Sequence, residues 1–352
     1  MPFDKNWKSL CIEPNSTINE AIKVLEDSDS KICLVVSKSD SKRHLEGTIT
    51  DGDIRRAILN GVKVESECYK AMNSNPTKAK EFLSISDLDN NLIEYQLRHL
   101  PLVSDSGYLL GLYYAEPTTP ESVKNSLFVI MAGGFGSRLK PYTENVPKPM
   151  IEVKGKPMLE HIIDKAKLSG FSKFALILHH LPEIIQDYFG DGSAFGVSIE
   201  YIVEEVPLGT IGGTSLLNLA DTSYSSIVVT NGDLVSNIDY QDMVKYHIKH
   251  NAFATMSVKE HRLVNEFGTV EISGNSITGF KEKPVTVSSI NAGIYVLSKE
   301  AFNLLETGKK KNMPDLFADS VSLGHRVIAY YLYENWNDVG RVSDLNKVNR
   351  GG

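Results

Sequence analysis

Apolar residues in the first part of the chain recur with the spacing of short helices and strands. After Thr17, apolar positions follow the 3.6-residue period of an amphipathic helix, at Ile18, Ala21, Ile22 and Leu25. A run at 32–36 then predicts a strand, and GTITDGDIRRAIL (47–59) predicts a strand, a turn and a second helix. The pattern indicates a small unit of mixed helices and strands.

A similar order of elements recurs downstream, with a helix followed by strands near 100–103 and at 109–113. One copy of this length would bury too little apolar surface alone, so the repeat implies two copies packed together. We therefore predict a tandem α+β domain spanning 1–118, with repeats at about 7–62 and 63–118.

The pattern changes after AEPTTPESVKNS (115–126), a polar stretch with prolines and no hydrophobic period. It predicts a linker, taken as 119–126. Beyond it, apolar runs of strand length alternate with glycine loops and helices, as in LFVIMAGG and SSIVVTNGD. Residues 127–352 are therefore expected to form an α/β domain around a Rossmann-like mixed, mainly parallel sheet.

Composition narrows the class of protein. At 352 residues, 41% hydrophobic and 23% charged, the chain is typical of a globular protein of about two domains. The net charge of −7 argues against a nucleic-acid binder. The apolar runs are too short to span a membrane. Three cysteines without metal spacing, at Cys11, Cys33 and Cys68, and an N-terminus without a signal sequence favour a cytoplasmic location.

The run LFVIM leads directly into AGGFGSRLKP, a glycine-rich loop with cations. The loop lacks the Lys-Ser/Thr of a P-loop and the third glycine of a dinucleotide fingerprint. Glycines let backbone N–H groups face an anion, arginine offers a fork for phosphate oxygens, and a lysine between prolines aims one charge. These residues predict a phosphate cradle formed by Gly133, Gly134, Gly136, Arg138 and Lys148.

The string AGGFGSRLKPYTENVPKPMIEVKGKPMLEHII closely resembles the signature of the sugar-1-phosphate nucleotidyltransferases. That signature is Gly-Gly-x-Gly-Ser/Thr-Arg-Leu-x-Pro, then Pro-Lys-Pro, then Lys-Pro and a helix. The resemblance covers roughly residues 126–345 and implies a GT-A-like fold. It places Ala132 and the loop glycines on the nucleotide, Arg138 on the leaving phosphates and Lys148 on the reacting phosphates.

Further segments match the family in order and spacing. The resemblance implies a base-reading segment with Gly209, Thr210 and Gly212, a sugar site with Gly232, Glu282, Asn291 and Gly293, and a cation on the incoming phosphate, Lys283. Two alternatives stay open: Thr210 also suits the cap of a following helix, and Glu282 with Lys283 also suits an exposed hairpin end.

The resemblance also implies a metal-assisted reaction without a general base, because a sugar phosphate is already ionised near neutral pH. Asp233, after an apolar strand, and Asp338, in ENWNDVGR, would hold Mg²⁺ between nucleotide and sugar phosphates. Turnover would release pyrophosphate. A non-catalytic nucleotide-sugar sensor is the competing class, and the presence of both aspartates disfavours it.

The nucleotide and the sugar are predicted less directly. PLGTIGG (207–213) resembles the PLGTAG-type segment of guanylyltransferases, which favours GTP. The domain order resembles the bacterial glucosamine-1-phosphate guanylyltransferases of the legionaminic acid pathway, which favours glucosamine 1-phosphate. Mannose 1-phosphate guanylylation, or uridylyl or thymidylyl transfer to another hexose 1-phosphate, is the alternative.

In the first domain, GTITDGDIRR resembles the motif of cystathionine-beta-synthase (CBS) domains. The resemblance places Thr50 and Asp53 on AMP or ATP, which could regulate the enzyme. Tyr114 and Pro117 occupy the equivalent positions of the second copy and put a second nucleotide site in doubt. Capping of a helix that begins near Ile54, by Asp51 or Asp53, or a purely structural pair, is the alternative. Because paired CBS domains often associate, a homodimer is the expected assembly.

Overall fold

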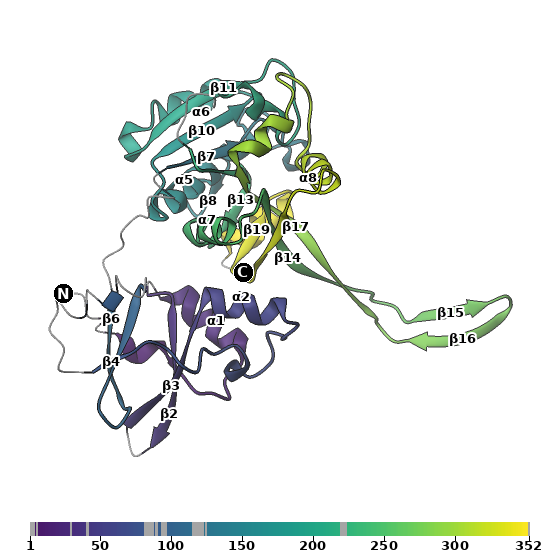
Figure 1. The fold of residues 1–352 in the computed structure, drawn as a ribbon. Helices are drawn as coiled ribbons and strands as arrows, with labels where there is room; N and C mark the ends of the chain where they lie inside the picture. The colour runs from purple at the N-terminus through teal and green to yellow at the C-terminus, as the bar shows by residue number, and fades with distance from the viewer. Residues whose placement is uncertain are drawn as a thin grey trace. The chain divides into compact units, whose positions relative to one another are not determined.

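The computed structural model describes residues 4, 6–28, 30–39, 42–80, 88, 91–92, 97–114, 123, 125–218 and 224–350. Three predicted features lie wholly or partly outside the described residues. They are most of the helix of the second repeat, residues 115–122 and 124 of the polar stretch before the second domain, and with them Pro117. The chain divides into two compact units, Met1–Thr118 and Thr119–Gly352 (Figure 1).

The first unit contains two three-stranded sheets with the same order of pairing. In each, a short strand pairs in parallel with a second strand, which pairs antiparallel with a third. The first sheet holds β1 (Cys11–Ile12), β2 (Ile32–Ser39) and β3 (Lys42–Thr50), with α1 (Ile18–Asp27), α2 (Asp51–Leu59) and the 3-10 helices η1 (Trp7–Leu10) and η2 (Cys68–Lys70). The second holds β4 (Ala79–Lys80), β5 (His99–Val103) and β6 (Leu109–Tyr114).

The registers of the two sheets correspond residue by residue. Val35 pairs with Gly47, and the register shifts at the next residue of β2. Leu102 pairs with Gly111, and the register again shifts at the next residue. Tyr114 therefore occupies the position in the second sheet that Thr50 occupies in the first, as the sequence comparison predicts.

The second unit is built on a seven-stranded mixed, mainly parallel sheet in the order β11-β10-β7-β12-β17-β14-β18. The predicted fold class is confirmed. The strands β11, β10, β7 and β12 are parallel, β17 is antiparallel to its neighbours, and β18 is parallel to β14. Their bounds are β7 (Ser126–Met131), β10 (Lys173–Leu178), β11 (Ser198–Val203), β12 (Ser226–Asn231), β14 (Ala254–Val264), β17 (Val285–Ser298) and β18 (Val327–Leu332).

Both faces of this sheet are covered, which explains why its strands read as continuous apolar runs. Successive residues of β7 alternate between two cores: Phe128 joins one and Val129 the other. The first core includes side chains of α5 (Met158–Leu168), α6 (Pro182–Phe189) and α7 (Tyr240–Lys249). The second includes α8 (Met313–Ser322).

Short elements connect the sheet to its loops. They are β8 (Glu152–Val153), β9 (Lys156–Pro157), β13 (Leu234–Ser236), β19 (Trp336–Asp338), α9 (Val342–Asn349), and the 3-10 helices η3 (Ser137–Leu139), η4 (Lys148–Met150), η5 (Ser193–Phe195), η6 (Gly212–Leu216) and η7 (Lys299–Leu304). No described helix is long and apolar enough to span a membrane.

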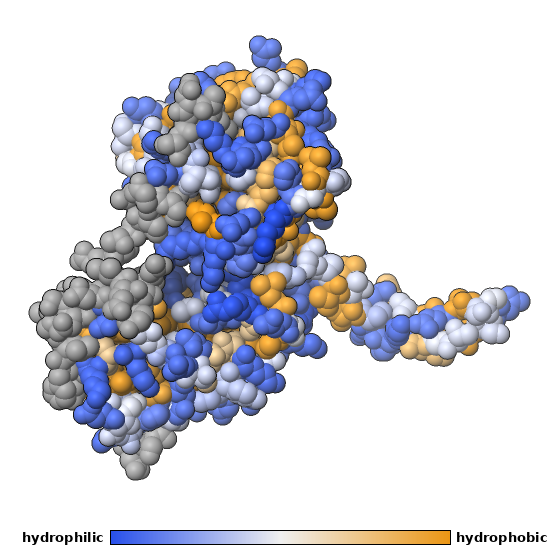
Figure 2. Space-filling model, viewed as in Figure 1, coloured by the Kyte–Doolittle hydropathy of each residue, from blue (hydrophilic) through white to orange (hydrophobic). Residues whose placement is uncertain are grey.

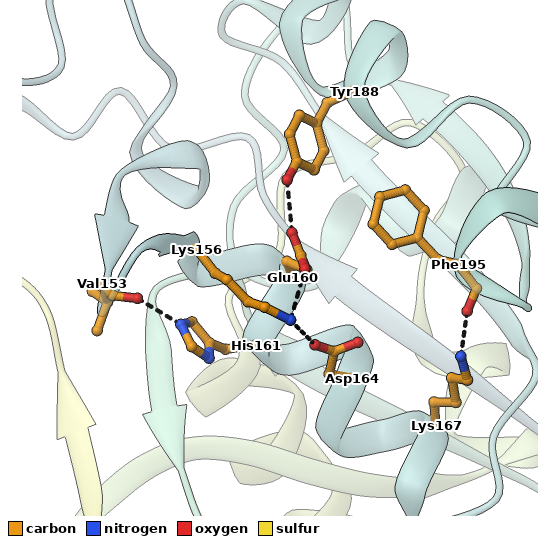
Figure 3. Close-up of polar contacts among 8 residues, drawn as sticks. All are labelled: Val153, Lys156, Glu160, His161, Asp164, Lys167, Tyr188 and Phe195. Atoms are coloured by element: carbon orange, nitrogen blue, oxygen red, sulfur yellow. Dashed lines mark hydrogen bonds and ion pairs between the residues drawn. The ribbon is translucent and has the colours of Figure 1, made fainter.

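Polar contacts fix the start of α5, which follows the Pro-Lys-Pro segment. Lys156 Nζ lies 3.0 Å from Glu160 Oε1 and 2.9 Å from Asp164 Oδ2, while the Tyr188 hydroxyl donates to Glu160 at 2.7 Å (Figure 3). Hydrogen bonds to both carboxylates raise the pKa of Lys156. The Met158 N–H donates to the Ile151 carbonyl at 3.1 Å and connects α5 to the end of η4.

Beyond the sheet, β14 and β17 continue together as a two-stranded ribbon. β18 pairs with β14 only as far as Lys259, whereas β14 and β17 pair out to Val264 and Val285. The ribbon ends in a hairpin of β15 (Thr269–Ser273) and β16 (Ser276–Lys281), which projects from the body of the unit (Figure 1). We call residues 260–289 the arm.

Candidate functional site

The predicted phosphate loop and the first predicted metal ligand leave the sheet at one edge. β7 and β12 are parallel neighbours in which Met131 pairs with Asn231. The Gly232 N–H donates to the Met131 carbonyl at 2.9 Å, so Ala132 and Asp233 follow adjacent strand ends. A Cβ on Gly232 would lie 3.1 Å from the Met131 oxygen. Ligands of open α/β sheets bind at such strand ends.

The phosphate loop turns sharply at Gly136, whose φ of 60° is left-handed. A Cβ here would lie 2.8 Å from Thr143 Cγ2 and 2.9 Å from Lys148 Cβ, so only glycine fits. The Thr143 hydroxyl donates to the Gly136 carbonyl at 2.9 Å. The turn therefore brings the loop directly against Lys148. Gly134, by contrast, has open space at its Cβ position.

The structure brings Lys148 and Asp233 together. The Lys148 ammonium is ion-paired with Asp233 Oδ2, with side-chain exposures of 9% and 24%. Proline at 147 and 149 fixes the backbone on both sides of Lys148, which begins the 3-10 helix η4. The predicted cation and the predicted metal ligand therefore belong to one site.

Asp338 completes this cluster. β13 and β19 pair with Leu234 opposite Asp338, and the Val339 N–H donates to the Asp233 carbonyl at 3.1 Å. Burial and the charge of Asp233 raise the pKa of Asp338, against the opposing effects of Lys148 and Arg138. Asp233 Oδ1 is buried without a hydrogen-bond partner among the described residues.

These two carboxylates suit a divalent metal ion. Both supply hard oxygen ligands, and a cation would offset their mutual repulsion and satisfy the unpaired oxygen of Asp233. No group of three or more His, Cys, Asp or Glu side chains with metal-binding geometry occurs in the described part of the chain. The remaining ligands would therefore have to come from phosphate oxygens and water.

A cavity of about 100 Å³ adjoins Asp338; its lining residues are Asn231, Leu234, Asn291, Ala292, Gly293, Tyr295, Trp336 and Asp338. Asn291 is held by its contacts, since its Nδ2 donates to the Tyr295 hydroxyl at 2.8 Å and its Oδ1 accepts from the Gly293 N–H at 2.9 Å. Gly293 has a φ of 75°, and a Cβ there would lie 2.8 Å from Asn231 Nδ2. The predicted sugar residues Asn291 and Gly293 thus line one pocket with Asp338.

The predicted base segment is held by a distant part of the chain. Lys311 O accepts from the N–H groups of Ile211 and Gly212, and Lys311 N donates to Leu208 O at 2.8 Å. A Cβ on Gly209 would lie 2.5 Å from Lys311 O, which leaves no room for a side chain.

The alternative in which Thr210 caps the helix after it is wrong. The Thr210 hydroxyl accepts from the Met313 N–H at 2.7 Å, at the start of α8. The segment that follows Thr210 is the 3-10 helix η6, and its N-cap residue is Ile211.

A buried carboxylate that sequence reasoning missed lies beside this segment. Glu204 Oε2 is 3.2 Å from the Cβ position of Gly133, and its Oε1 is 2.2 Å from that of Gly213. Burial raises the pKa of Glu204, while a hydrogen bond from the Leu208 N–H lowers it. Oε1 is buried and has no hydrogen-bond partner among the described residues. The sequence feature that could have indicated this residue is the pair Glu204 and Glu205, which directly follows a strand and precedes the glycine loop.

Glu282 and Lys283 do not join this site in their own chain. Both are exposed on the arm, between β16 and β17. At about 3.3 Å per residue along an extended strand, Lys283 is about 26 Å from Asn291. The expectation that Lys283 meets the incoming phosphate is therefore not realised within one chain, because β17 carries it outward.

In the first unit, Thr50 and Asp53 contact each other. The Thr50 N–H and hydroxyl donate to Asp53 Oδ2 at 2.8 and 2.6 Å, and Asp53 Oδ1 is ion-paired with Arg56. This capping box begins α2, as the capping alternative predicts. The adenine-nucleotide site stays a prediction.

The family model described as nucleotidyl transferase matches residues 127–351, and a CBS domain model matches residues 6–60. Both resemblances noted in the sequence are thereby confirmed. The second CBS repeat stays a prediction.

Individual relatives match the second unit. The chain is 32% identical to a UTP–glucose-1-phosphate uridylyltransferase of Synechocystis sp., over 63% of this chain and 62% of that protein. It is 29% identical to the D-glycero-alpha-D-manno-heptose 1-phosphate guanylyltransferase of Aneurinibacillus thermoaerophilus, over 63% and 96%. The crystal structure of HddC from Yersinia pseudotuberculosis is 25% identical, with a TM-score of 0.51, over 64% and 98%.

Proposed function

Since this chain belongs to the nucleotidyl transferase family, we propose that it transfers a nucleoside monophosphate from a nucleoside triphosphate to a sugar 1-phosphate. Pyrophosphate is the second product. The observation that carries the proposal is the cluster of Lys148, Asp233 and Asp338 at the strand ends beside the glycine loop. That cluster combines a phosphate-binding cation with a pair of metal-binding carboxylates.

The reaction requires charge stabilisation more than proton transfer. A sugar phosphate oxygen attacks the α-phosphorus, its bond to phosphorus forms as the bond to pyrophosphate breaks, and no proton must be removed first. Arg138 lies on the loop that turns at Gly136 and neutralises charge on the leaving phosphates. Lys148, freed from Asp233, neutralises charge on the reacting phosphate.

Asp233 and Asp338 would hold the divalent cation, with Mg²⁺ favoured for oxygen ligands. The bound ion would supply Lewis-acid stabilisation of phosphate charge. The protein's own contribution is to hold the two carboxylates next to each other. The pairing of β13 with β19 holds them there.

Guanine is the favoured base, and Glu204 supports it. A carboxylate accepts hydrogen bonds only, and guanine presents N1–H and N2–H donors side by side on its pairing edge. Uracil and thymine present a single N–H flanked by acceptor oxygens, and a carboxylate repels those oxygens. Glu204 lies between Gly133 of the phosphate loop and Gly213 of the base segment, so its carboxylate adjoins both predicted nucleotide-binding segments. Glucosamine 1-phosphate is the favoured sugar, and mannose 1-phosphate is the alternative.

Pyrophosphate release tests this function. The full chain, with Mg²⁺, is incubated with each of GTP, UTP, dTTP, ATP and CTP and with a panel of hexose 1-phosphates. We expect turnover with GTP and an amino-hexose or hexose 1-phosphate. Turnover with UTP or dTTP and none with GTP would refute the guanine assignment. No turnover with any pair, in a protein that binds nucleotide, would support the sensor alternative.

We also propose that the first unit binds AMP or ATP near Thr50 and Asp53, because its sequence matches a CBS domain model. Calorimetric titration of AMP into the full chain should show binding that Asp53→Asn removes. The same variant should lose about 1 kcal/mol of stability through the capping box. If the variant loses stability but binds AMP as the wild type does, Asp53 caps the helix and does not bind the nucleotide.

A further inference from the structure

The outer hairpin of the arm has one apolar face and one polar face, and both are exposed. Val270 pairs with Phe280, and Ile272 pairs with Ile277, so these four side chains share a face. Their exposures are 46%, 76%, 69% and 57%. The opposite face carries Thr269 and the ion pair of Lys281 with Glu271, at 2.6 Å. Figure 2 shows hydrophobic residues along the projecting arm.

A hairpin surrounded only by water would not be expected to carry so many exposed apolar side chains. An isolated two-stranded ribbon is marginally stable in water, and a contiguous exposed apolar face marks a contact surface. The inner ribbon repeats the pattern, because Val264 pairs with Val285 and both are exposed. The arm is therefore built to pack against another surface.

The two described cations that act on Asp338, Arg138 and Lys148, serve the leaving and reacting phosphates in the proposed reaction, so the incoming sugar phosphate calls for a further cation. The charges of Asp233 and Asp344 oppose those two cations, and Lys148 is ion-paired with Asp233. A sugar phosphate brings a further charge of about −1.5 to −2. Lys283 is an exposed cation on the arm, about 26 Å along the strand from Asn291 of its own site.

We propose that the arm reaches into a second copy of this chain, where Lys283 and Glu282 complete the sugar-phosphate site of the partner. The arrangement is a reciprocal exchange, in which each copy lends its arm and receives the other, as in a two-fold symmetric dimer. Lys283 neutralises the incoming phosphate, and Glu282 accepts hydrogen bonds from sugar hydroxyls.

The mouth of the receiving site offers a matching apolar surface. The loop that carries Arg138 exposes Phe135, Tyr142 and Val146, with exposures of 54%, 52% and 37%. These side chains suit the apolar face of the arm. The packing removes both surfaces from water and sets the arm beside the phosphate loop. This inference rests on the proposed transferase function only for the role of Lys283; the exchange itself rests on the arm.

Complementation between two inactive chains tests the proposal. Lys283→Gln removes the arm cation, and Asp233→Asn disables the site. The two variants are co-expressed with different affinity tags, and the mixed dimer is isolated through both tags. In an arm-exchanged dimer, the intact site of the first chain receives the intact arm of the second. We expect about half of the wild-type turnover per dimer, whereas each single-variant dimer falls by about 100-fold.

A cis arrangement predicts an inactive mixed dimer, and that result would overturn the proposal. Full activity of Lys283→Gln alone would do the same. Lys281→Gln is the matched control on the same arm, and it should keep wild-type turnover. If the wild type itself is inactive, the result counts against the proposed function. The arm exchange is then tested by a second measurement, of the oligomeric state. Replacing residues 265–284 with a short turn should weaken the dimer, so that it dissociates at a higher protein concentration than the wild type in light scattering; a wild-type monomer, or an unchanged dissociation, would refute the exchange.

Discussion

The ammonium of Lys148 is ion-paired with the carboxylate of Asp233, although 85 residues separate them in the sequence. The two groups have opposite tasks in the proposed reaction, since one binds phosphate and the other binds metal. Their pairing gives a mostly buried ammonium an opposite charge before substrates arrive. When substrates bind, this ion pair would be replaced by a pair between Asp233 and the metal ion and a pair between Lys148 and a phosphate.

The first prediction concerns Asp233→Asn, which keeps the shape of the side chain and removes its charge. Turnover in the pyrophosphate assay should fall by at least about 100-fold, because the neutral amide is a poor ligand for a hard divalent cation. The circular dichroism spectrum should stay that of the wild type. Asp187→Asn, on the exposed face of α6, is the matched control. Near-normal turnover of Asp233→Asn would refute the metal assignment.

The second prediction compares two glycines of the phosphate loop. Gly136→Ala forces a left-handed residue against Thr143 and Lys148, and it should lower the free energy of unfolding by about 1–3 kcal/mol. Gly134→Ala meets open space and should leave that free energy within about 0.5 kcal/mol of the wild type. Denaturant unfolding of both variants measures the difference. Equal stability would show that the turn at Gly136 is not required.

The third prediction concerns base selection by Glu204. Glu204→Gln supplies a donor as well as an acceptor, so the ratio of kcat/KM for GTP over UTP should fall by at least about 10-fold. Turnover with the favoured sugar phosphate measures the ratio. Glu205→Gln, at the exposed neighbouring position, should leave the ratio unchanged. A ratio unaffected by Glu204→Gln would remove the structural support for guanine.

The fourth prediction is a dependence of stability on pH. Burial lowers the pKa of His247 to about 4, and its Nδ1 lies 2.8 Å from the Thr255 hydroxyl. An unfolded histidine takes up a proton near pH 6.5, whereas the folded one stays neutral until about pH 4. Stability should therefore fall as the pH drops from 6.5 to 4, by about 3 kcal/mol for this group.

Unfolding in urea at pH 7.5, 6 and 5 measures this effect. The chain has two tryptophans, so a Trp7→Phe background leaves Trp336 to report on the second unit. His247→Gln should flatten the pH dependence, and His261→Gln, on the exposed arm, should not. A slope unchanged by His247→Gln would contradict the assignment.

Much of the second unit could be predicted from local sequence. The run LFVIM is apolar at every position because both faces of β7 are buried, and its length is that of a strand. The neighbouring ends of β7 and β12 follow from parallel pairing, so the glycine loop and Asp233 could be expected at one edge. Asp338 could be predicted only from the family spacing, since the short polar stretch ENWND has no strand pattern of its own.

Contacts between distant segments could not be predicted. The Thr210 hydroxyl oxygen accepts a hydrogen bond from the Met313 N–H, 103 residues away, and nothing near Thr210 signals that partner. Glu204 is buried by glycines from two other loops, which its own strand does not reveal. The motif around Lys283 indicates a phosphate-binding residue, but strand length and pairing decide how far from Asn291 it lies.

The side chains of the lysine-rich stretch 309–311 can vary, although its backbone supports the base segment. It holds the base segment through backbone atoms, with the carbonyl of Lys311 receiving two N–H groups and its own N–H meeting Leu208. Side chains do not enter these bonds, so mutation can alter the charge there while the backbone bonds remain. Deleting a single residue would shift the register of the carbonyl. Among homologues, we expect length to be preserved in this stretch where residue identity drifts.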